Sequence, residues 1–206
     1  NSQDDYSIGG TGTLTLGAGG LTITGGGVTN ISAGIDLAAD LTWDIGTATV
    51  TVTGRLRQIH DGTDRYHFTK TGAGTLTLMG PEDNSSGGAT RPFITCDQGV
   101  LNYEVSGLSN SVRPTLRAVG TGTIHVNSPA DLRYKNVRAS GGGELVFHVS
   151  TNPLEYSGVT LGDDDYDANS QPDGGGTLTI DDGVTVVTRL FINTRGSTIR
   201  TLGTGV

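Results

Sequence analysis

Apolar and polar residues alternate in short runs along most of the chain. In each run Leu, Ile or Val takes every second position, and Thr or another polar residue lies between. This period of two places the apolar side chains on one face of a β-strand and the polar ones on the other. Thr suits an outer strand face because its β-branched side chain favours extended backbone. The runs that predict strands are Gly12–Leu16, Gly20–Thr24, Ala48–Thr53, Gly74–Leu78, Gly122–Val126, Gly143–Val149 and Gly176–Ile180.

The recurrence of these runs predicts how the strands are arranged. The phrase Gly-x-Leu-x-Leu, or a close variant, returns throughout the chain, which is typical of a repeat architecture. The Asn-Gly and Asp-Gly pairs that mark two-residue hairpins are few, and no segment has a convincing helical period. We therefore expect an all-β fold, a right-handed parallel β-helix (β-solenoid) with projecting loops, rather than a sandwich of hairpins.

Three segments depart from the alternation and predict the projecting loops. Arg55–Lys70 is polar and carries two histidines, so we expect it to project from a coil. Met79–Pro92 contains two prolines and a Ser-Ser-Gly-Gly run, which predict a turn-rich connection. Gly162–Gly176 is acidic and has no alternation, so it predicts a long loop.

The length and composition of the chain indicate the number of domains and the kind of protein it comes from. A chain of 206 residues fits one domain, and its 34 glycines lie mostly at the ends of the apolar runs, where the backbone must turn. The chain begins at Asn1 rather than Met and carries no signal peptide. We therefore expect residues 1–206 to be a single β-solenoid segment from a larger surface protein.

The net charge and the length of the apolar runs exclude two classes of partner. The formal net charge of −8 repels phosphate backbones, so no nucleic-acid partner is expected. No apolar run approaches the roughly 20 residues that span a bilayer, so no direct membrane insertion is expected. Cys96 is the single cysteine and is expected to be a small buried apolar residue. Trp43 alternates with Leu41 and Ile45, which predicts a core position, with a sugar-stacking surface position as the alternative.

Residues 70–80 have the pattern Lys-x-Gly-x-Gly-Thr-Leu-x-Leu-x-Gly. With this motif the stretch Thr69–Leu101 resembles the autotransporter passenger-associated repeat, and with its lead-in the match covers Ile31–Leu101. It departs where Ser86 replaces a Tyr and where a few extra residues stand around Arg91–Cys96. Residues 102–206 match in rhythm alone. The resemblance implies a right-handed β-helix in a large secreted or surface-anchored bacterial protein, and it implies no catalytic residue. The matching residues are Lys70, Gly72, Gly74, Thr75, Leu76, Leu78, Gly80, Asn84, Gly87, Gly88, Thr90, Gly99 and Leu101.

One acidic run offers a candidate metal site. In this run Asp or Asn stands at every second position from 163 to 169. Carboxylate and amide oxygens at that spacing can supply several of the ligands that Ca²⁺ takes. The Gly and Glu that complete an EF-hand loop are absent, so a solvated acidic loop is the alternative. No other cofactor is expected. The candidate calcium ligands are Asp163, Asp165, Asp167 and Asn169.

Two groups of ionisable residues could serve a β-helix enzyme that acts on polysaccharides. Neither has a spacing that acid–base chemistry requires, because that chemistry depends on a geometry that the sequence does not show. We therefore expect the chain not to be an enzyme. One group is Asp44, His60, Asp61, Asp64, Arg65 and His67, and the other is Asp131, Arg133 and Lys135.

The expected function follows from the architecture. We expect an extracellular structural or adhesive rod, secreted or at a bacterial cell surface, that presents its loops to a carbohydrate or protein receptor. One alternative is a self-assembling filament or sheath subunit that associates through uncapped solenoid edges. The other alternative is a polysaccharide-acting β-helix enzyme.

Overall fold

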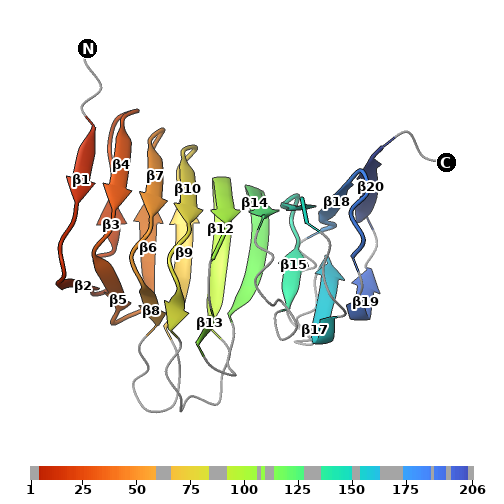
Figure 1. Cartoon of the computed structure of the whole chain (residues 1–206). Coiled ribbons are helices and arrows are strands. Elements are labelled where there is room, and N and C mark those ends of the chain that lie inside the picture. Colours follow the sequence, from red (N-terminus) through yellow and green to blue (C-terminus); the bar gives the residue numbers. More distant parts are fainter. Residues whose placement is uncertain are drawn as a thin grey trace.

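The fold is taken from a computed structural model. The structure describes residues 5–58, 66–83, 92–105, 108–109, 114–127, 136–149, 154–162, 174–186, 188–193 and 196–203. Within these ranges every regular element is a β-strand. The strands pair in parallel and lie side by side along one axis from β1 to β20 (Figure 1). The chain is therefore a parallel β-solenoid, as the alternation predicts.

Three faces make up each complete coil. The first face contains β1 (Tyr6–Ile8), β4 (Val28–Ile31), β7 (Thr49–Val52), β10 (Thr75–Leu78), the later parts of β12 (Phe93–Tyr103) and β14 (Thr115–Val126), β16 (Glu144–Phe147), β18 (Thr177–Asp181) and β20 (Thr198–Leu202). The second contains β3 (Leu21–Thr22), β6 (Leu41–Asp44), β9 (Phe68–Thr71), the earlier parts of β12 and β14, β15 (Val137–Ala139), β17 (Leu154–Leu161) and β19 (Thr188–Asn193). The third contains β2 (Thr13–Leu16), β5 (Gly34–Leu37), β8 (Leu56–Gln58), β11 (Glu82–Asp83) and β13 (Leu108–Ser109).

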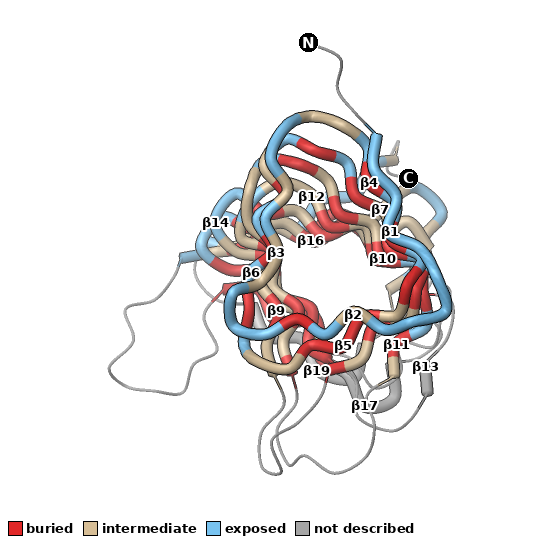
Figure 2. Tube along the Cα trace, turned by 90° about the vertical axis from the view of Figure 1, so that its left-hand side faces the viewer, coloured by how far each residue is buried: buried red, intermediate tan, exposed pale blue. Residues whose placement is uncertain are grey.

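The direction of winding is visible along the axis. Figure 2 looks from the N-terminal end, and the chain passes clockwise from β1 through β2 and β3 to β4 as it recedes from the viewer. This winding is right-handed, as expected. Strands β12 and β14 each continue from the second face into the first, so these two faces belong to one 15-stranded sheet, whereas the third face is a separate 5-stranded sheet.

The core consists of stacked apolar columns inside the tube. On the first face the register aligns buried residues of successive coils, so each packs on its counterpart about 4.8 Å away. Leu76 and Leu78 point inward, as the alternation predicts. Leu41, Trp43 and Ile45 are buried as well, and the Trp43 ring meets Phe68 edge-on at 4.8 Å between centroids. The sugar-stacking alternative for Trp43 is therefore wrong. One such column is Val50, Leu76, Leu101, Ile124, Leu145 and Leu178.

Lys70 is a fully buried cation within this core. Its Nζ donates to the backbone carbonyls of Thr71 at 3.3 Å, Gly72 at 2.8 Å and Gln98 at 2.7 Å. The three protons of the ammonium thus match three carbonyls of two adjacent coils. Burial lowers the pKa of Lys70. In the register position above it, burial raises the pKa of the Cys96 thiol to about 11, which confirms Cys96 as a buried, protonated core residue.

Glycine is required where coils touch at the corners. A Cβ at Gly80 would lie 1.9 Å from the carbonyl oxygen of Gly54, and a Cβ at Gly54 would lie 1.9 Å from that of Ala33. Gly72 has a φ of +77°, and a Cβ there would lie 2.5 Å from Gly46 N. At Gly74 the distance to the Ala48 carbonyl oxygen would be 2.3 Å. The backbones therefore approach too closely for any side chain, as the sequence predicts for positions 72, 74 and 80.

The predicted loop Arg55–Lys70 is too long at both ends. Its first part is β8 and its last part is β9, in which Gln58 and Lys70 occupy buried inward positions. Because Gln and Lys are usually surface residues, their presence at inward positions interrupts the apolar–polar alternation that predicts a strand. Residues 59–65 lie outside the described part.

The predicted bounds of the other two loops need less correction. Met79–Pro92 contains the two-residue strand β11, and residues 84–91 lie outside the described part. Of Gly162–Gly176, residues 163–173 lie outside it as well.

We predict that Gly80→Ala destabilises the fold by about 3 kcal/mol, because the added methyl group must push two coils apart. Thermal unfolding followed by circular dichroism measures the change. Gly12→Ala is the matched control, since a Cβ there meets nothing within 4 Å. Equal melting temperatures for the two variants would contradict the close corner contact.

Candidate functional site

At one corner of the solenoid, strand ends on successive coils lie in register. The ends of β8, β11 and β13 are aligned on three successive coils, because Asp83 pairs in register with Arg57 on one side and with Ser109 on the other. We call this edge, where the third face passes to the second, the loop corner.

The connections that leave the loop corner differ from the tight turn one coil earlier. Residues 38–40 suffice to join β5 to β6, whereas residues 59–67, 84–92 and 110–114 join the next three pairs of strands. Because the strand ends are in register, these three segments start in line along one edge of the rod. Two of them lie in the regions that the sequence predicts as loops.

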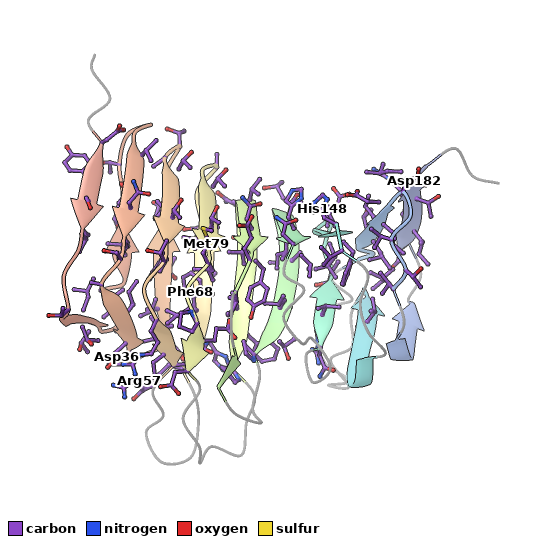
Figure 3. All side chains as sticks on the ribbon, in the orientation of Figure 1. Asp36, Arg57, Phe68, Met79, His148 and Asp182 are labelled. Carbon is purple, nitrogen blue, oxygen red and sulfur yellow. The ribbon has the colours of Figure 1, made fainter. Side chains whose placement is uncertain are left out.

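An ion-pair network lies at the base of the loop corner. Arg57 makes a bidentate contact with Asp36, in which Nε donates to Oδ1 at 2.9 Å and Nη2 donates to Oδ2. Arg55 approaches the same carboxylate at 3.5 Å and donates to Asp83 at 3.2 Å. The hydrogen bond to Asp36 raises the pKa of Arg57, against an opposing effect of burial. Figure 3 shows Asp36 and Arg57 together at this edge. The network ties β5, β8 and β11 together where the loops begin.

Backbone contacts close the neck of segment 59–65. The buried Gln58 donates from Nε2 to the carbonyl oxygen of Tyr66 at 3.2 Å, which brings the two ends of the segment together. The amide of His67 donates to Asp40 Oδ1 at 2.7 Å, and His67 Nδ1 accepts the amide of Phe93 at 3.0 Å. His67 is thereby held as the tautomer that carries its proton on Nε2.

The acid–base groups proposed from the sequence are not assembled in the described residues. Asp44 accepts the amide of Gly46 at 3.0 Å, and His67 Nδ1 is occupied by the backbone amide of Phe93. The remaining members lie outside the described part, as do the calcium candidates Asp163, Asp165, Asp167 and Asn169, so that calcium site stays a prediction. The members outside are His60, Asp61, Asp64, Arg65, Asp131, Arg133 and Lys135.

Two negative findings hold for the part of the chain that the structure describes. No three or more His, Cys, Asp or Glu side chains are placed to hold a metal ion. No helix there has the length and apolar character to cross a bilayer.

A second polar cluster lies on the outer side of the first face, and the sequence analysis missed it. The rings of His125 and His148 lie nearly coplanar, with 4.9 Å between their centroids and 9° between their planes. His125 Nδ1 lies 2.6 Å from His148 Nε2, and His148 Nδ1 contacts Asp181 Oδ2. One hydrogen-bonded chain, which we call the histidine chain, thus crosses three successive coils.

Flanking side chains continue the polar surface around the histidine chain. Thr179 donates to Glu144, and Asn127 donates to Glu104 at 3.1 Å. Burial lowers the pKa of His125 below its usual 6.5, and charge on His148 lowers it further. The sequence signal for the cluster was a pair of outward histidines separated by 23 positions, which is close to the length of one coil.

No protein-family model, curated protein or solved structure matches this chain. The resemblance of Thr69–Leu101 to the autotransporter repeat therefore rests on its own residues. Of what that resemblance implies, the parallel β-helix is the part that the structure shows.

We predict that Asp36→Ala lowers the free energy of unfolding by about 2–3 kcal/mol, because Arg57 loses its bidentate partner in a partly buried position. Urea unfolding measures the change. Asp182→Ala at an exposed site is the control, and we expect an effect within about 0.5 kcal/mol. A loss no larger than that of the control would show that the network adds nothing to the loop corner.

Proposed function

We propose that this chain is a rigid rod from an extracellular bacterial surface protein and that its loop corner contacts a carbohydrate or protein receptor. The observation that carries the proposal is the alignment, on adjacent coils, of the strand ends from which three connections leave. A solenoid whose core is unbroken from coil to coil sets the spacing between them. The proposal includes no catalytic activity and no cofactor.

The construction of the loop corner supports a binding role. Binding costs less when the contacting segments are already held in place, because less conformational entropy is lost. The Asp36 network and the Gln58 contact hold the strand ends from which these segments leave. The segments themselves are rich in hydroxyl, amide, carboxylate and guanidinium groups, which suit a polar ligand.

An extracellular location is part of the proposal. The resemblance of Thr69–Leu101 to the autotransporter repeat and the acidic, Gly- and Thr-rich composition support it. A rod that extends outward from a cell surface also gives the repeated coils a function, since each coil adds reach without adding a new fold.

Replacement of one loop tests the proposal. Residues 58–66 are exchanged for Leu-Ala-Ala, the sequence that occupies the same place one coil earlier at 37–39. We expect the rod to remain folded by circular dichroism and to lose binding on a glycan array and on a panel of host-cell receptors. Thr53→Asn, on the exposed side of the first face, is the control and should bind as the parent does. Binding by the shortened chain at the parent's level, or no binding by the parent, would overturn the proposal.

Self-association is a second candidate, and the terminal described coils favour it. Tyr6 and Ile8 are 60% and 39% exposed at one end, and Ile199 and Leu202 are 50% and 60% exposed at the other. Ile8 pairs in register with the buried Ile31, and Ile199 pairs with the buried Leu178. The core columns therefore reach the ends of the described coils, where further coils of a longer chain or a second copy would cover them.

Electron microscopy and sedimentation distinguish the two arrangements. If the edges associate, the purified chain should form regular filaments, and Ile199→Lys should return it to separate rods because a charge then enters the stacked column. Thr53→Asn serves again as the control. Separate rods at every concentration tested would exclude this second candidate.

A further inference from the structure

We propose that His125, His148 and Asp181 form an acid-sensitive clasp across three coils of the first face, closed near neutral pH and opened when both imidazoles are protonated. The clasp is independent of the loop corner. It joins β14, the residue that follows β16 and the end of β18.

The geometry of the histidine chain defines its proton arrangement. The carboxylate of Asp181 can only accept, so the proton in its contact with His148 lies on His148 Nδ1. The Nε2 of a neutral His148 then accepts a hydrogen bond from His125 Nδ1–H across 2.6 Å. In this arrangement both neutral rings therefore carry their single proton on Nδ1.

The same geometry limits how many protons the two histidines can bind while they remain in contact. The contact between the two rings holds one proton. A first added proton is accommodated, because either His125 or His148 can be the charged donor. A second added proton puts an N–H on both facing nitrogens and a positive charge on both rings, so the rings must separate.

The charges around the clasp come from each neighbouring strand of the first face. Glu104 follows β12, Glu144 lies on β16, and Asp182 follows the Asp181 of β18. Arg200 of β20 lies in register with Thr179. Glu144 and Asp181 favour the charged form of His125, whereas burial and His148 oppose it, and the net effect is a lowered pKa.

The lowered pKa of His125 sets the sign of the pH dependence. The unfolded chain binds the proton more tightly than the folded one, so stability from the neutral ring is fully present above about pH 6.5 and is lost as the pH falls below it. The loss falls on the coils that the clasp joins.

Hydrogen exchange on the whole chain tests the proposal. Between about pH 7.5 and pH 5.0 we expect the protection factor of the His148 amide, which donates to Val126 O at 3.2 Å, to fall about tenfold. The Met79 amide, which donates to Val52 O in the same column away from the clasp, is the internal reference and should keep its protection. His125→Asn should abolish the difference, and Thr123→Asn, on the same strand and face, should preserve it.

An equal loss at both amides, or a loss in His125→Asn as large as in the parent, would overturn the clasp. Nitrogen NMR of the two histidines in the unaltered chain tests it without a variant. We expect both rings as Nδ1–H tautomers at about pH 7.5. An Nε2–H tautomer at His148 would show that the chain to Asp181 does not form.

Discussion

The close approach of successive coils at their corners is the constraint on which the rest of the structure depends. Parallel strands stack about 4.8 Å apart, so the backbone of one corner rests directly on the corner below. Gly54 and Gly80 allow this contact because each has a carbonyl where a Cβ would stand. With the corners stacked, Leu76 and Leu78 pack on their counterparts in the next coils, and the apolar columns become continuous.

The interior of the stacked coils also holds polar side chains, which are hydrogen-bonded to backbone carbonyls there. Lys70 is buried because its ammonium donates to three backbone carbonyls at a corner. Gln58 is buried because Tyr66, at the far end of the connection that follows β8, offers it a backbone carbonyl. Polar residues thus enter the tube where the backbone turns, since hydrogen bonding there compensates for lost water.

Outward side chains of successive coils lie next to one another because the coils stack at a constant spacing, and not because they pack in the core. Thr49 and Thr51 stand in register with Thr75 and Thr77, which forms a short threonine ladder. The next coil places Val100 and Asn102 there, so no unbroken threonine array forms. Farther along, the same pitch brings the His125 ring within hydrogen-bond distance of His148. One scaffold therefore supports a plain ladder, an ion-pair network and a titratable cluster, according to the outward residues at each coil.

The sequence by itself determined the local pattern. Alternation predicted inward Leu76, Leu78 and Trp43, and the glycines at 72, 74 and 80 predicted corners, because these features depend on neighbouring residues alone. Tertiary structure decided what depends on coil length. It set the limits of the loop at Arg55–Lys70, whose polar inward residues disguise two strands. It also brought His125 to His148 and Asp181, since side chains 23 and 33 positions apart meet only when the intervening coils have closed.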